Sequence, residues 1–269
     1  MPAIDIARLR KQAARLADFF FVPDEFLKHL REVLEFYVNR TMRKQPAIAP
    51  GSNLPTYRTH SFVIKQIEQE ISRRASDYPA AALELADLLW DEGHLETRLL
   101  AAFLLGRIPP QEGTLLVRLT AWTQQVRDSN LRAELLDTSL RRIRTETPDQ
   151  FLELIGEWLQ PERTRLWSNG IQAVISAVSD PAFINLPPLL KLIAPVIEAS
   201  PAKLQNEIEE LVLALHKKYP TETTYFLRQV LAASTDPMTT ITFRRISSSF
   251  PPALKEELRE FIRVKPGQP

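Results

Sequence analysis

Prolines divide the middle of this chain into segments of similar length, and this spacing constrains the fold more than any other feature. The steps between Pro79, Pro110, Pro148, Pro181 and Pro220 are 31, 38, 33 and 39 residues. Proline is tolerated in the first turn of a helix, because its missing N–H has no partner there to lose. Each interval also holds two helical stripes of apolar residues. Helix pairs recurring every ~35–45 residues predict an all-α fold, an α-solenoid of HEAT-like repeats, with a compact helical bundle as the alternative.

The apolar stripes have the spacing of helices. Four of them place apolar residues three, four or seven positions apart, which covers one face of a helix. Their members are Leu95, Leu99, Ala102 and Phe103; Leu115, Leu119, Trp122 and Val126; Phe151, Leu154, Ile155, Trp158 and Leu159; and Leu204, Ile208, Leu211 and Leu215. We find no convincing strand alternation.

The N-terminal part of the chain has a different pattern. Residues 4–20 and 24–40 each predict a helix, and Pro23 marks the start of the second. Three prolines and a Gly-Ser-Asn cluster between residues 45 and 55 predict a loop. We therefore predict an N-terminal helical cap at residues 1–44, a linker loop at 45–58 and a HEAT-like repeat array at 59–265, all within one continuous domain.

Composition excludes several classes of protein. The chain has no cysteine, which excludes disulfide frameworks, thiol nucleophiles and thiolate metal sites. Seven glycines against 21 prolines disfavour Gly-rich phosphate loops, and four scattered histidines offer little to a metal site. No apolar run approaches the ~20 residues that span a bilayer, and the N-terminus lacks the apolar core of a signal peptide. We expect no cofactor, no metal, no membrane contact and a cytoplasmic location.

Two stretches of the chain are similar to a known family. The first is residues 54–67, LPTYRTHSFVIKQI, which lead into a predicted helix. The second is residues 88–102, LLWDEGHLETRLLAA, in which a Leu-Trp helix end precedes a Glu-x-Arg-x-x-Ala helix. Together they resemble the AlkD-type DNA alkylation repair family of HEAT-like repeat proteins. Segments at 216–227 and 243–246 resemble its later repeats, so the resemblance covers about residues 54–250.

The resemblance implies a C-shaped solenoid whose positively charged concave face holds duplex DNA. In active members an Asp and aromatic side chains assist excision of cationic N3- or N7-alkylated purines, and a carboxylate stabilises the developing charge. When the sequences are aligned on Pro148 and Trp158, the family's catalytic Asp, a cleft Trp, a basic residue and the last cleft Trp fall at Ala133, Ser129, Gly170 and near Leu213. The resemblance therefore implies a divergent member that lacks the catalytic Asp.

Three acidic residues are weak catalytic candidates if this alignment shifts by one turn. They are Asp128, Glu134 and Asp137. Asp128, next to Ser129, is most simply an N-cap, and Asp137 fits a buried structural carboxylate. Glu134 and Asp137 share one helix face, a pattern that permits paired acid–base chemistry but is also common on solvated helices.

Other residues of the family-like stretches have structural interpretations. Trp90, Trp122 and Trp158 lie on apolar stripes, so we predict that they pack between repeats. Glu96 and Arg98 open a helix, and we interpret them as helix-terminal salt-bridge residues that support the adjacent repeat.

Basic residues are concentrated in a few places. Residues 40–74 contain seven basic and two acidic side chains, a net charge of +5. Basic side chains on one shared surface can pair with phosphates without reading the base sequence. The nucleic-acid-binding candidates are Arg58, Lys65, Arg141, Arg142, Arg163, Arg165, Trp167, Arg244 and Arg245.

The sequence supports three hypotheses about function. The whole chain has a net charge of +1, so a uniformly basic nucleic-acid binder is disfavoured and a local basic face is required. The first hypothesis is non-specific binding of double-stranded DNA through a concave basic face, in a repair context, with catalysis lost. The second is a protein-interaction scaffold without DNA affinity, since a fold does not fix a function. The third is an active 3-methyladenine or 7-methylguanine glycosylase with a relocated carboxylate. Enzyme activity stays undecided, and the sequence favours a non-enzyme.

Overall fold

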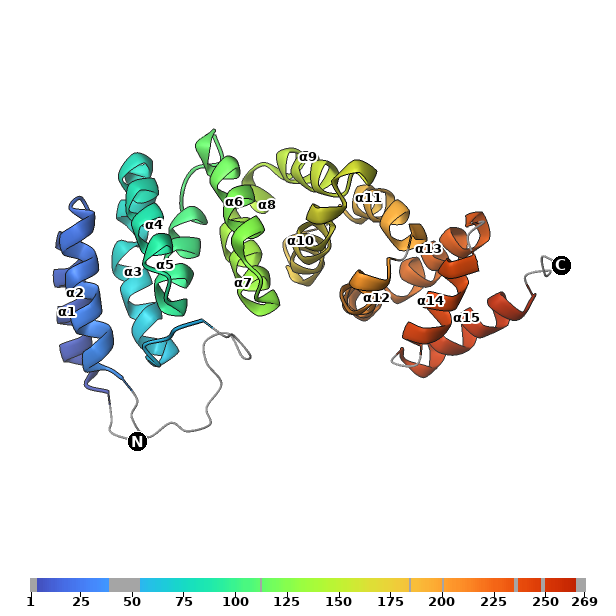
Figure 1. Cartoon of the computed structure of the whole chain (residues 1–269), viewed down its shortest axis with the longest axis horizontal. Coiled ribbons are helices and arrows are strands. Elements are labelled where there is room, and N and C mark those ends of the chain that lie inside the picture. Colours follow the sequence, from blue (N-terminus) through green and yellow to red (C-terminus); the bar gives the residue numbers. More distant parts are fainter. Residues whose placement is uncertain are drawn as a thin grey trace. The chain divides into compact units, whose positions relative to one another are not determined.

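The computed structural model describes residues 4–38, 54–111, 113–183, 185–199, 201–234, 237–247 and 250–264 (Figure 1). Within these ranges the regular structure is helical, and one isolated β-bridge joins Val38 to Thr59. The predicted all-α, helical repeat fold is therefore confirmed.

The chain divides into two compact units, Met1–Thr147 and Pro148–Pro269. The first unit contains α1 (Ile6–Asp18), α2 (Pro23–Phe36), α3 (Ser61–Asp77), α4 (Pro79–Glu92), α5 (Leu95–Leu105), α6 (Thr114–Gln125), α7 (Ser129–Ser139) and α8 (Arg141–Glu146). The second unit contains α9 (Pro148–Trp158), η1 (Pro161–Leu166), α10 (Trp167–Ser179), α11 (Leu186–Ala199), η2 (Ala202–Leu204), α12 (Gln205–Lys218), α13 (Pro220–Ala233), α14 (Pro237–Ile246) and α15 (Pro252–Val264).

Proline marks the start of many of these helices, as the sequence predicts. The first residues of α2, α4, α9, α13 and α14 are Pro23, Pro79, Pro148, Pro220 and Pro237. The two predicted N-terminal helices are present as α1 and α2, somewhat shorter than their predicted ranges. Most of the predicted linker, along with Arg40, Arg43 and Lys44, lies at residues 39–53, outside the described part of the chain. The predicted boundaries of cap, linker and array stay predictions.

The helices of the first unit pack in two rows. Along one row, α1 contacts α3, α3 contacts α5, and α5 contacts α7, while α2 contacts α4 in the other row. Helix α5 packs against α3, α4 and α7, so nine of its eleven residues are buried. Nearly every side of α5 is therefore shielded from water, and its polar residues must find partners within the protein.

The second unit repeats the two-row arrangement. Helices α10, α12 and α14 contact one another in sequence, and α9, α11, α13 and α15 form the other row. Each pair of helices buries its apolar stripes against its neighbours, which is how short helical repeats obtain a shared core.

The predicted apolar stripes form this core. Nearly all of their members are buried, and Phe103 and Leu204 are half-buried. Trp90, Trp122 and Trp158 are 1%, 5% and 1% exposed, so their predicted role in core packing is confirmed. A fully buried apolar side chain of this size stabilises a fold by roughly 2 kcal/mol.

Two glycines shape the elements around the site described next. Gly93 ends α4 with a left-handed φ of 86°, which glycine adopts without strain. Gly106 follows α5, and a Cβ there would overlap the carbonyl group of Thr138 in α7. The missing side chain thus allows the end of α5 to lie directly against α7.

Candidate nucleic-acid interface

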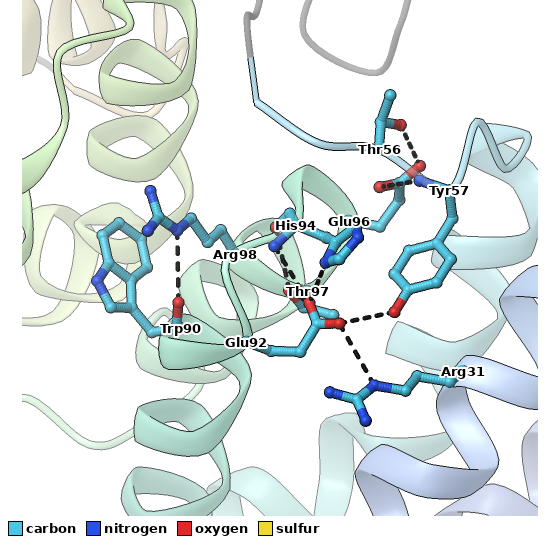
Figure 2. A network of polar contacts seen from close by, with 9 residues as sticks. All are labelled: Arg31, Thr56, Tyr57, Trp90, Glu92, His94, Glu96, Thr97 and Arg98. Atoms are coloured by element: carbon cyan, nitrogen blue, oxygen red, sulfur yellow. Dashed lines mark hydrogen bonds and ion pairs between the residues drawn. The ribbon is translucent and has the colours of Figure 1, made fainter.

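Two buried glutamates fix the segment that precedes α3. The carboxylate of Glu96, which is 1% exposed, accepts hydrogen bonds from Thr56 Oγ1 at 2.6 Å, Tyr57 N at 3.0 Å and Thr59 N at 3.3 Å. Figure 2 shows the Glu96 carboxylate reaching the chain at Thr56 and Tyr57. A carboxylate surrounded by N–H and O–H donors makes charge-assisted hydrogen bonds, which are stronger than neutral ones.

Glu92 is the second of these residues, and its side chain is 2% exposed. It accepts hydrogen bonds from the Tyr57 hydroxyl at 2.6 Å, Thr97 Oγ1 at 2.9 Å and His94 N at 3.1 Å. The His94 ring lies 2.8 Å from the same carboxylate and the guanidinium of Arg31 lies 3.4 Å from it (Figure 2). Burial on its own raises the pKa of Glu92, but the hydrogen bonds from Tyr57, Thr97 and His94 lower it overall. We call Glu92, Glu96 and the donors they hold the glutamate clamp.

The other polar residue of the Glu-x-Arg motif has a different partner. The Arg98 guanidinium lies 4.8 Å from the ring centre of Trp90, and its Nε donates to the Trp90 carbonyl at 3.4 Å (Figure 2). Trp90 in turn stacks on Trp122, with ring centres 4.4 Å apart and an angle of 4° between the planes. Glu96 supports the neighbouring segment through hydrogen bonds, so its interpretation as a salt-bridge residue is wrong. The residues of the family-like motif thus make structural contacts within the first unit: Glu96 with the segment before α3, and Arg98 with Trp90.

Charged residues from α3, α7, the start of α8 and the turn after α5 gather in the first unit. Glu68 of α3 lies within the electrostatic influence of Glu134 in α7 and of Lys65, Arg141 and Arg107. We call these five residues the α3–α7 cluster. Two of the predicted nucleic-acid-binding residues, Lys65 and Arg141, belong to it, as does the catalytic candidate Glu134.

The row packing explains why this cluster forms. Arg107 directly follows Gly106, whose close approach to Thr138 brings the end of α5 to α7. The Arg107 guanidinium donates to Ser72 Oγ of α3, and its carbonyl accepts from Arg142 Nη1 at 2.6 Å. Arg107 therefore ties α3 to α8 across the end of α5.

Both carboxyl groups of the cluster are easier to protonate than usual. Burial raises the pKa of Glu68, and the neighbouring negative charge of Glu134 raises it further. Burial also raises the pKa of Glu134, with Asp137 adding to the effect. Lys65 and Arg141 oppose both shifts without cancelling them.

Much of the basic charge on this surface is paired within the chain. Arg141 lies 3.3 Å from Asp137, and Arg142 lies 2.6 Å from Glu146. Lys65 is exposed, and the described part of the chain offers its ammonium group no ion pair within 4.0 Å. The cluster is consequently a mixed surface whose net charge depends on the protonation of Glu68 and Glu134.

The three catalytic candidates occupy different environments. Asp128 caps α7, and its side chain accepts from Leu131 N at 2.8 Å. Asp137 lies within 3.4 Å of both Arg141 and the buried Arg144. These two carboxylates have structural partners. Glu134 keeps part of its surface in water, but the surrounding protein desolvates its carboxylate enough to raise its pKa, and it belongs to the α3–α7 cluster with Lys65 and Arg141.

The remaining predicted residues lie apart from this cluster. Arg58 is exposed in the segment before α3, and Arg163 and Arg165 lie in η1, where Arg163 is 3.5 Å from Glu157. Arg244 and Arg245 are exposed in the last turn of α14. Trp167 is 6% exposed, and its indole N–H donates to the Gln160 carbonyl at 2.9 Å. Because Trp167 is buried in this way, its ring is not presented for base stacking in this structure.

The positions singled out by alignment also differ in environment. Gly170 is buried in α10, and a Cβ there would collide with the Leu159 side chain, so no basic side chain fits. Ser129 opens α7, and Ala133 precedes Glu134 on the same helix.

Sequence analysis did not identify Glu68 or Arg107 as site residues. Glu68 lies on the charged face of α3, where a lone glutamate between basic residues has no distinctive spacing. Arg107 directly follows Gly106 at the end of an apolar helix, and this pair of residues is the sequence feature that could have indicated a close approach to another helix there. Among the described residues, no group of three His, Cys, Asp or Glu side chains has an arrangement that could hold a metal ion. No helix in the described ranges is long and apolar enough to cross a bilayer.

A sequence model of the family described as DNA alkylation repair enzyme matches residues 52–245, nearly three quarters of the chain. The match includes the glutamate clamp apart from Arg31, the Trp90 stack and the α3–α7 cluster. No curated protein and no solved structure matches the chain.

Proposed function

The chain belongs to the DNA alkylation repair family, and from this premise we propose that it binds duplex DNA without reading its sequence and no longer excises bases. The family places its function in DNA repair. The α3–α7 cluster, together with Arg58 and Arg142, is the surface that we propose for the DNA backbone. A cytoplasmic location stays a prediction.

One observation carries the DNA-binding proposal. Lys65 and Arg141, from two separate parts of the chain, influence both Glu68 and Glu134, and Arg107, from a third part, influences Glu68. Cations on a shared surface can neutralise neighbouring phosphates and release counterions, which provides affinity without base contacts. The carboxylates among them oppose phosphate binding, so we propose a weak interaction that strengthens as Glu68 and Glu134 become protonated.

The loss of excision is proposed on separate grounds. The sequence resemblance, when matched on Pro148 and Trp158, implies an alanine and a serine, Ala133 and Ser129, where active family members have an aspartate and a tryptophan. A methyl group cannot stabilise the positive charge that develops when a glycosidic bond to a cationic base breaks. Asp128 and Asp137 already serve as a helix cap and as an arginine partner.

Fluorescence anisotropy with a labelled duplex tests the DNA-binding proposal. We expect binding at about 50 mM salt, and log K should fall linearly with log salt by about 0.9 per phosphate contacted. The Lys65→Ala/Arg141→Ala variant should reduce this slope by about 2. Lys28→Ala/Lys191→Ala removes two exposed lysines from α2 and α11, which lie outside the proposed surface, and should leave the slope unchanged. Absence of binding at low salt would overturn the proposal and favour a protein partner.

One observation favours a second candidate, an active alkylpurine glycosylase. Glu134 lies one residue from the aligned catalytic position and beside the second carboxyl group, Glu68. An ionised carboxylate there could stabilise a cationic purine as its glycosidic bond breaks. This candidate predicts release of 3-methyladenine or 7-methylguanine from alkylated duplex, with loss of release in Glu134→Gln. Release that persists in Glu134→Gln, Asp128→Asn and Asp137→Asn would exclude all three carboxylates as catalysts.

A further inference from the structure

The backbone at Arg58 has an uncommon conformation. Its φ is +57°, and Arg58 is the non-glycine residue with a positive φ in the described part of the chain. A side chain with a Cβ adopts this left-handed region at an energetic disadvantage, so the surrounding structure must hold it there.

The glutamate clamp holds Arg58 from both sides. The backbone N–H groups of Tyr57 and Thr59, one before and one after Arg58, both donate to the carboxylate of Glu96. The Arg58 N–H donates at 2.9 Å to Thr56 Oγ1, which itself donates to Glu96. The neighbouring Pro55 carbonyl accepts from Leu95 N at 2.8 Å, which attaches the segment to the first turn of α5. Five hydrogen bonds thus fix the chain at and around a strained residue.

The Arg58 side chain itself is exposed, and its guanidinium makes no ion pair or hydrogen bond with another described residue. Other arginines of the first unit differ in this respect. Arg73 lies 3.4 Å from Asp77, Arg74 lies 3.2 Å from Asp18, and Arg118 makes two 2.9 Å contacts with Asp87. A buried carboxylate therefore maintains a strained backbone whose side chain has no described partner within the protein.

We propose that Glu96 is a positioning residue for Arg58, and that the clamp presents the Arg58 guanidinium in a fixed direction to one phosphate of bound DNA. This inference rests on the proposed DNA-binding function and adds a specific contact outside the α3–α7 cluster. Fixing the backbone in advance reduces the entropy lost when an arginine closes on a phosphate. A guanidinium also matches two phosphate oxygens at once, which an ammonium cannot do.

The test measures duplex affinity against salt concentration for Arg58→Ala, Arg58→Lys and Arg58→Gly, with Lys28→Ala as the matched control. We expect Arg58→Ala to reduce the salt slope by about 0.9 and the affinity at low salt about fivefold. Arg58→Lys should keep the slope and recover part of the affinity. Arg58→Gly should raise the melting temperature, because glycine adopts a positive φ without strain, and yet lose the same slope as Arg58→Ala.

The role of Glu96 is tested by combining variants. Thr56→Val removes one donor to Glu96 and the acceptor of the Arg58 N–H, and it is milder than a change of the buried glutamate itself. We expect Thr56→Val to weaken DNA binding two- to threefold when Arg58 is present and to have no effect in the Arg58→Ala background. An equal loss in both backgrounds would mean that the clamp stabilises the fold without positioning Arg58.

The failures of the two proposals are distinguishable. If wild-type protein does not bind duplex at about 50 mM salt, the proposed function and this inference both fail. If wild type binds and Arg58→Ala matches Lys28→Ala in slope and affinity, the function stands and the inference is overturned. A gain in melting temperature for Arg58→Gly with unchanged DNA binding would likewise overturn it.

Discussion

The first unit contains two pairs of glutamates whose surroundings differ in one respect. In the glutamate clamp, Glu92 and Glu96 are nearly inaccessible to water, but hydrogen-bond donors surround both. In the α3–α7 cluster, burial desolvates Glu68 and Glu134, and the negative charge of Glu134 acts on Glu68. The pKa of Glu92 is lowered, whereas the pKa values of Glu68 and Glu134 are raised. The number of donors, more than the depth of burial, determines whether a carboxylate stabilises this fold or strains it.

The two kinds of carboxylate differ in what they can still bind. A carboxylate with all its donors in place supports the scaffold and has no capacity left for a ligand. A carboxylate without them raises the free energy of the folded protein unless it is protonated or meets an external cation. Carboxylates with perturbed pKa values are common at functional sites, and for this reason we propose the α3–α7 cluster, and not the clamp, as the surface that meets a ligand.

The largest expected effect is on the clamp. Replacing Glu96 with Gln puts an NH₂ group against N–H and O–H donors and removes the charge from three hydrogen bonds. We expect a loss of about 3 kcal/mol in the free energy of unfolding, measured by urea denaturation. A loss under about 1 kcal/mol for Glu96→Gln would mean that the clamp is not needed for the fold.

Acid should weaken the clamp through Glu92. Because the folded-state pKa of Glu92 lies below its ordinary value of 4.5, its stabilisation is fully present above that value and is lost as the pH falls through the folded-state pKa. Glu92→Gln should therefore lower stability by about 2 kcal/mol at pH near 7 and by progressively less in acid. Thermal melts of wild type and variant across this range measure the difference. Parallel pH curves for the two proteins would contradict a lowered pKa.

The sequence predicts much of the fold because the fold depends on local patterns. Apolar spacing and proline position are properties of neighbouring residues, so helices such as α4, α9 and α13 could be predicted to begin at their prolines. The division at Thr147 could not, since it depends on contacts summed across whole helices.

The candidate site was predictable only in part. Lys65 and Arg141 could be identified as basic residues near helix ends. Their convergence with Arg107 depends on the close approach of α5 to α7 at Gly106, which involves residues about 30 positions apart. Glu96 shows the opposite case. The Glu-x-Arg motif identified it, but its partners lie some 40 positions earlier in an irregular segment, so its interpretation as a salt-bridge residue was wrong.

A smaller effect is expected when the cluster loses its negative charge. In Glu68→Gln/Glu134→Gln the cations face phosphate without competing carboxylates, so duplex affinity at low salt should rise about fivefold at neutral pH. Wild-type affinity should increase as the pH falls below neutral, because the pKa values of both carboxyl groups are raised above the ordinary 4.5 and the groups become protonated in that direction. The double variant should lack this increase. Equal pH dependence in both proteins would place the titrating groups elsewhere.

The smallest expected effect is a change in the free energy of unfolding when Glu68 of the cluster is replaced. Replacing Glu68 should stabilise the protein at neutral pH, whereas replacing a clamp glutamate should destabilise it. A carboxyl group whose folded-state pKa is raised contributes stability that is fully present below its ordinary value of 4.5 and is lost as the pH rises through the folded-state pKa. At neutral pH, Glu68→Gln should therefore stabilise the protein, by about 0.5 kcal/mol once solvent screening is allowed for. The gain should shrink as the pH falls below 4.5, since wild-type Glu68, with its raised pKa, is then mostly protonated. Urea denaturation at the two pH values measures the change. A loss of stability at neutral pH would show that Glu68 has a compensating partner and that the two pairs of glutamates do not differ in the way described.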